Sequence, residues 1–188
     1  MSKNYLIATA AAVLLGAVQA SSAGDASRVN RLLDSLDVEH HWPAYVRVDA
    51  DSGDPMPRGS ALGVGRHPHC ATFVHAVARR VGVDMGLTQD ANDVIHWLRG
   101  QPGGWRRLAG PVEAQAVANR GEFVVGARET PPWGHIAIVR ASSRSAADVL
   151  ANGPEITQVG NHNYTDTTAS VGFGRANLGA VEYYAHAL

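Results

Sequence analysis

Apolar residues recur three and four positions apart in the first part of the chain, a spacing that places them on one face of a helix. The clearest case begins at Cys70, carries Phe73, Val74 and Val77 on one side, and ends at Gly82. The pattern predicts four helices: residues 25–36, residues 70–81, a segment from Thr88 or Asp90 to Gly100, and a segment from Pro111 to near Gly121.

The later part of the chain holds short apolar runs separated by Gly, Pro and Asn, which is typical of strands. Residues 49–69 lack any period and are predicted to be a loop that shapes one wall of a cleft. Helices that precede strands predict an α+β fold with a helix packed on an antiparallel sheet. The predicted strands are residues 122–127, 134–140, 155–160 and 181–185, with residues 42–48 as a further candidate.

The first residues have the pattern of a secretory signal peptide. Lys3 precedes an apolar run over residues 5–18, and small-residue cleavage sites end at Ala20 and Ala23. The run is shorter than the roughly 20 residues that cross a bilayer, which favours cleavage over a membrane anchor. We therefore predict an exported protein, periplasmic or secreted, with residues 1–23 as the signal and residues 24–188 as one domain without a membrane segment.

Charge and cysteine content narrow the possible functions. The formal net charge is −1, so no basic field draws the protein to nucleic acid. Separately, we expect the protein to be a monomer. Cys70 is the only cysteine, so no disulfide forms within the chain. In an exported protein a lone thiol is either incidental or kept for its chemistry.

Cys70 is a candidate nucleophile because it stands at the start of a predicted helix. Unpaired N–H groups and the helix dipole at that end lower the pKa of a thiol, and the Cys70 N–H is placed to hold an oxyanion. The alternative is a small buried core residue, since Cys70 shares a helix side with Phe73 and Val77.

His135 is the candidate base. It follows Gly134 at the start of an apolar strand, where an imidazole is held rigidly and still reaches the surface. A third group has to orient the ring, and Asn163 and Asn161 share one face if the strand over residues 155–160 continues. Gln158 faces the other way unless Gly160 marks a bulge, so we rank both asparagines ahead of it; the alternative for them is turn chemistry.

These segments resemble a known family. His69-Cys70-Ala71-Thr72-Phe73-Val74, followed by Gly134-His135-Ile136-Ala137-Ile138-Val139, is similar to the NlpC/P60 and CHAP group of papain-like peptidoglycan hydrolases. Gly121-Glu122-Phe123-Val124-Val125 and Asn161-His162-Asn163-Tyr164 resemble the strands before and after the family's histidine. The resemblance covers residues 65–164. It implies a papain-like fold, no cofactor or metal, and cleavage of an amide in peptidoglycan stem peptides or their fragments.

Three other functions stay open at this point. His67, His69 and Cys70 are donors for zinc, although the usual zinc spacings are absent. In a papain-like acyltransferase or thioesterase the histidine precedes the cysteine in the sequence, so His67 or His69 would be the base. The candidate base His135 follows Cys70, which favours the hydrolases. A secreted protein without catalysis would carry Cys70 by accident.

Overall fold

The computed structural model describes residue 26, residues 28–86 and residues 90–188. The predicted signal, residues 1–23, and Thr88 lie outside the described residues. In the described ranges, each helix is too short or too polar to cross a membrane.

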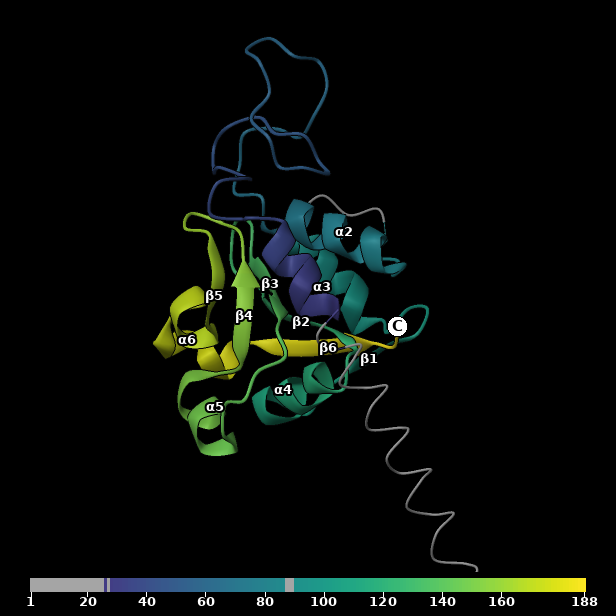
Figure 1. Cartoon of the computed structure of the whole chain (residues 1–188), viewed down its shortest axis with the longest axis vertical. Coiled ribbons are helices and arrows are strands. Elements are labelled where there is room, and N and C mark those ends of the chain that lie inside the picture. Colours follow the sequence, from purple (N-terminus) through teal and green to yellow (C-terminus); the bar gives the residue numbers. More distant parts are fainter. Residues whose placement is uncertain (1–25, 27, 87–89) are drawn as a thin grey trace, which may run out of the picture.

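A six-stranded antiparallel sheet organises the chain, in the order β1-β6-β2-β3-β4-β5 (Figure 1). Its central strands β2 and β3 are almost fully buried, as their apolar runs predict. The predicted α+β class is confirmed. The strands are β1 Trp105–Arg107, β2 Phe123–Arg128, β3 His135–Val139, β4 Glu155–Gln158, β5 Tyr164–Thr168 and β6 Glu182–His186.

Side chains that alternate along the strands divide the core into two clusters. Ile136 and Ile138 of β3 belong to the cluster beneath α2 and α3, whereas Ala137 and Val139 belong to the one beneath α4 and α6. Helical residues 28–35 join the first cluster, and α5 packs on α4 (Figure 1). The helices are α2 Cys70–Val81, α3 Ala91–Arg99, α4 Pro111–Asn119, α5 Ala146–Asn152, α6 Ala169–Gly172 and the 3-10 turn η1 Arg175–Ala180.

The ends of α2 and α3 follow local rules. Helix α2 ends at Gly82, whose φ of 78° is the left-handed value that glycine adopts without strain. Helix α3 begins after Asp90, whose carboxylate accepts the N–H of Asp93 at 3.0 Å. The predicted bounds of α2, including its start at Cys70, are confirmed, and this start fixes where the thiol lies.

The predicted strand over residues 42–48 is wrong. Trp42 and Tyr45 have φ values of 50° and 61°, which no strand accommodates, and only Val48 makes isolated bridges, to Pro55 and Val64. The predicted loop over residues 49–69 is otherwise confirmed, and Figure 1 shows it projecting from one end of the molecule. Strands β1 and β5 and helix α5 were not predicted, and β4 ends at Gln158, two residues short of the prediction.

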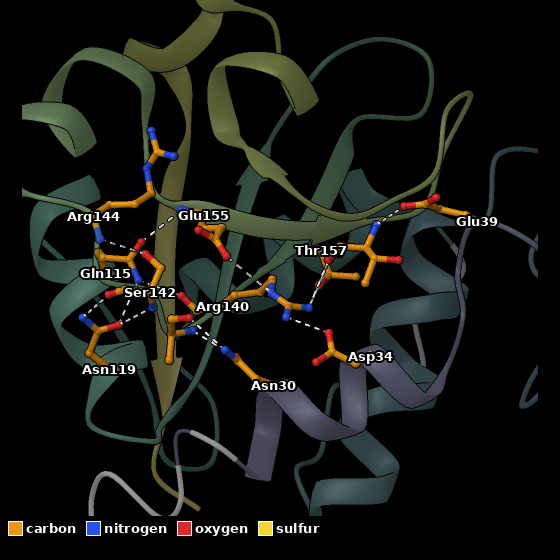
Figure 2. Close-up of polar contacts among 12 residues, drawn as sticks. Asn30, Asp34, Glu39, Gln115, Asn119, Arg140, Ser142, Arg144, Glu155 and Thr157 are labelled. Atoms are coloured by element: carbon orange, nitrogen blue, oxygen red, sulfur yellow. Dashed lines mark hydrogen bonds and ion pairs between the residues drawn. The ribbon is translucent and has the colours of Figure 1, made fainter.

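A buried arginine fastens the N-terminal helix to the sheet (Figure 2). Arg140 follows β3, and its guanidinium donates to Asp34 at 2.7 Å and to the Thr157 hydroxyl at 3.1 Å. It also donates to the carbonyl of Thr165 at 3.0 Å. Because its side chain is 8 % exposed, these bonds replace water that the charge would otherwise bind.

We expect Arg140→Ala to lower the free energy of unfolding by about 3 kcal/mol, because it removes several charge-assisted hydrogen bonds and leaves a void. Urea unfolding measures the change. Arg144→Ala is the matched control, since it removes the partly exposed ion pair with Asp148 of α5 and should cost less than about 1 kcal/mol. Equal losses in both variants would contradict the assignment of Arg140 as the fastening residue.

Candidate active site

A cavity of about 480 Å³ lies where α2, β3, β4 and α6 come together. Cys70 and His135, far apart in the chain, both line it. The end of the long loop contributes His67 and Pro68, as predicted for that segment, and Trp133 forms part of the wall. The size suits a small peptide segment.

Cys70 opens α2 with its side chain almost buried. Burial raises the pKa of its thiol, and the backbone N–H groups of Ile136, Ala71 and Cys70 itself only partly oppose this; the Asp90 carboxylate adds to the rise. The prediction of a lowered thiol pKa at this helix end is therefore wrong. The resting residue is a neutral thiol that needs a base.

The same N–H groups define where negative charge is stabilised. The backbone amides of Cys70 and Ala71 belong to the first turn of α2, where no carbonyl inside the helix accepts them. They lie beside the sulfur, at the place where the oxygen of an attacked carbonyl would gather charge. The fold thus provides the N–H donor expected at Cys70.

His135 begins β3 directly after Gly134. Gly134 has a φ of 67°, and a Cβ there would lie 2.2 Å from the Asn92 amide oxygen, so only glycine fits. The Asn92 side chain bonds Thr130 and Pro132 and thereby fixes the turn that leads into β3. His135 therefore starts from a rigid backbone.

The His135 ring is held from two sides. Its Nε2 lies 3.0 Å from the Gln158 amide oxygen, and the ring packs on Phe173 in a T-shaped arrangement at a centroid distance of 4.9 Å. Because Gln158 accepts, Nε2 carries the proton and Nδ1 keeps a free lone pair. Burial lowers the pKa of the ring, with the Gln158 bond acting the other way, so the imidazole is neutral at neutral pH.

Gln158 is the third group that the sequence ranked last. Its amide nitrogen donates to the His162 carbonyl at 2.9 Å, which leaves the amide oxygen for His135. A Cβ at Gly172 of α6 would lie 2.4 Å from that oxygen, so the glycine makes room for the amide. Continuing the β3–β4 register, in which Ile138 pairs Thr157, places Gln158 on the same face as His135.

Asn163 and Asn161 make no hydrogen bond to the His135 ring. Asn163 donates to the carbonyls of Val38, His41 and Trp42 and accepts the Gly160 N–H at 2.9 Å. The amide oxygen of Asn161 accepts the Tyr45 hydroxyl at 3.1 Å. Both follow the end of β4, so the strand that would have given them one face stops before it reaches them. The geometry replaces them with Gln158 as the orienting group.

The thiol and the imidazole share the cavity without a hydrogen bond to each other; both residues belong to the described chain. Catalytic contacts of this kind often tighten only when substrate binds. The structure therefore places the two groups in one cavity without joining them.

The alternative zinc site finds no support in the geometry. The His67 and His69 rings lie 4.8 Å apart between centroids, but His69 is buried and its Nε2 donates to the Val46 carbonyl. Among the described residues, no three His, Cys, Asp or Glu side chains gather as a metal site.

Comparison of the chain with known protein families and with curated proteins gives no match.

Proposed function

We propose that the protein is a papain-like cysteine amidohydrolase that cleaves amide bonds in peptidoglycan stem peptides. The observation that carries this proposal is the oriented imidazole. His135 shares one cavity with Cys70, and its Nε2 proton is engaged by Gln158, which leaves Nδ1 to take a proton. A helix-start cysteine and a fixed neutral histidine are what amide hydrolysis through a thiol requires.

In the proposed reaction His135 Nδ1 takes the thiol proton as Cys70 Sγ attacks the amide carbon. The oxyanion forms beside the Cys70 N–H. The imidazolium then gives its proton to the leaving nitrogen, the C–N bond breaks, and a thioester remains. Water attacks the thioester with His135 again as base, which releases the carboxylate and restores the thiol.

Two features of the sequence support the cell wall as the location of the substrate. The motifs around Cys70 and His135 resemble those of peptidoglycan hydrolases, and the first 23 residues have the pattern of an export signal. The substrate assignment therefore depends on the resemblance and the leader, whereas the reaction type depends on the site.

Digestion of purified peptidoglycan, read by mass spectrometry of the released fragments, tests the proposal. We expect the wild type to release fragments that differ by one hydrolysed amide. Metal chelation should leave the rate unchanged, because the proposed chemistry uses only protein groups. Rates that fall with chelation and return with zinc would contradict the thiol mechanism.

Gln158→Glu should move the pH dependence of catalysis. The ordinary pKa of His135 is 6.5 and burial lowers it, so the acid limb of kcat/KM in the wild type should lie below 6.5. A carboxylate at position 158 stabilises the imidazolium, which raises the pKa of His135 and shifts that limb upward. A pH profile of kcat/KM measures the shift.

Gln158→Ala is the companion variant. It removes the contact that holds the ring and should lower kcat by about 10- to 100-fold, the size of loss seen when a group that orients a metal-binding histidine is removed. Asn163→Ala breaks bonds to the N-terminal segment instead, so it should reduce stability without moving the acid limb. A shifted acid limb in Asn163→Ala, with none in Gln158→Glu, would restore the asparagine as the orienting residue.

A further inference from the structure

Tyr45 is an exposed aromatic residue in a strained backbone conformation. Its φ is 61°, a left-handed value that costs a bulky residue about 1 to 2 kcal/mol, and 61 % of its surface is accessible. The side chain is not buried in the core, and glycine would adopt this backbone conformation without strain, so packing does not explain the tyrosine. Such outliers point to a role that the surrounding contacts enforce.

Two hydrogen bonds of Tyr45 and one of its neighbour Val46 hold this segment in place. Its N–H donates to the His67 carbonyl at 3.3 Å, and the next carbonyl, of Val46, accepts His69 Nε2 at 2.8 Å. These two bonds tie the Tyr45 backbone to the segment that runs directly into Cys70. The third joins its hydroxyl to Asn161, which lies in the turn after β4.

A second hollow of about 520 Å³ adjoins the catalytic cavity. Four of its lining residues do not line the catalytic cavity: Glu39, Pro43, Ala44 and Asn163. The residues that line both hollows, and so form their boundary, are Tyr45, Gly160, Asn161, His162 and Tyr164. The Tyr45–Asn161 hydrogen bond therefore spans the boundary between the two.

We propose that Tyr45 and Asn161 form a partition that closes one end of the catalytic cleft and selects peptides that end there. This inference rests on the proposed function and adds a limit on the length of the substrate. A peptide bound at Cys70 meets the tyrosine ring at the boundary, and a longer one has to displace the ring to reach the second hollow. The cost of that displacement falls on long peptides alone.

Binding to the Cys70→Ala variant tests the partition without hydrolysis. Fluorescently labelled stem peptides, lengthened one residue at a time from either end, are titrated and their Kd values measured by anisotropy. With Tyr45 present, lengthening past one end should weaken binding by about tenfold or more, the size of effect expected when a pocket rejects an added group.

Tyr45→Gly, added to Cys70→Ala, should reduce that length penalty, measured as the ratio of the Kd values of long and short peptides, to less than about threefold, since glycine adopts the same φ without strain. Tyr45→Phe, which keeps the ring but not the bond to Asn161, should give a penalty between the two. Leu62→Gly, at an exposed position of the loop over residues 49–69 that lines neither hollow, should leave the penalty unchanged.

A penalty that persists in Tyr45→Gly, or that is absent with Tyr45 present, would overturn the partition while leaving the hydrolase intact. A Tyr45→Phe penalty equal to that of Tyr45 would overturn the role of the hydrogen bond. If no stem peptide binds, both the partition and the proposed substrate are wrong. If the peptides bind but the wild type does not hydrolyse them, the thiol mechanism is wrong and the partition can still be judged from the Kd values.

Discussion

Cys70→Ala is expected to reduce hydrolysis of stem peptides by about 10⁴-fold or more, which leaves only background. The sulfur forms the bond to the acyl group, and no other thiol exists in the chain to replace it. Mass spectrometry of peptidoglycan digests with equal amounts of wild type and variant measures the loss.

The fold should survive this change. Alanine is the strongest helix former, and the loss of one nearly buried sulfur should cost about 1 kcal/mol. Thermal unfolding followed by circular dichroism provides the control. Residual activity within tenfold of the wild type, from a folded variant, would refute Cys70 as the nucleophile.

Alkylation of the single cysteine gives an independent readout of the same residue. Cys70 is 5 % exposed and burial raises the pKa of its thiol above the ordinary value of 9.0, so iodoacetamide should react more slowly than with free cysteine at neutral pH. Each equivalent of label should remove an equivalent amount of activity.

The sequence predicted those parts of the fold that depend on local periodicity. Helix α2 and strand β3 carry continuous apolar patterns, and both were predicted within one residue of their observed ends. Strand β1 has only three residues, two of them arginine, and the polar edge strand β5 shows no alternation of buried and exposed positions. Such strands form because an adjacent strand of the sheet pairs with them through hydrogen bonds, and the local sequence pattern does not indicate that pairing.

The positions of the proposed nucleophile and base were predictable for the same reason. Cys70 stands at the start of a helix and His135 at the start of a strand, and both ends follow from sequence. Gln158 was not, because its contact depends on the β3–β4 register and on the glycine at position 172, which lies on α6. Pairing the two strands residue by residue would have placed it beside His135.

The thiol pKa shows a similar limit. The helix start was read correctly, but the effect of burial on the thiol depends on how closely β3 and α3 approach Cys70. The N–H of Ile136 lowers the pKa of the thiol, but burial outweighs it, and the negative charge of Asp90 adds to the rise. Local position alone therefore gave the wrong direction, and the consequence is a mechanism in which the base is essential.

His67→Ala is the matched control for the test of His135 as the base. His67 lines the same cavity, and a reversed histidine–cysteine order, as in an acyltransferase or thioesterase, would make it the base. We expect less than about a tenfold loss from it, because its Nδ1 is engaged with the Pro68 carbonyl at 2.7 Å. A larger loss in His67→Ala than in His135→Ala would reverse the assignment.

His135→Ala itself is expected to lower kcat/KM by about 10³- to 10⁴-fold at neutral pH, because a neutral thiol with a raised pKa then has no partner to take its proton. The pH profile should change in shape as well. The acid limb set by the imidazole should disappear, and the residual rate should rise with pH as hydroxide forms the thiolate. An acid limb that persists unchanged in this variant would show that another group is the base, since only the loss of the titrating imidazole removes that limb while Cys70 stays in place.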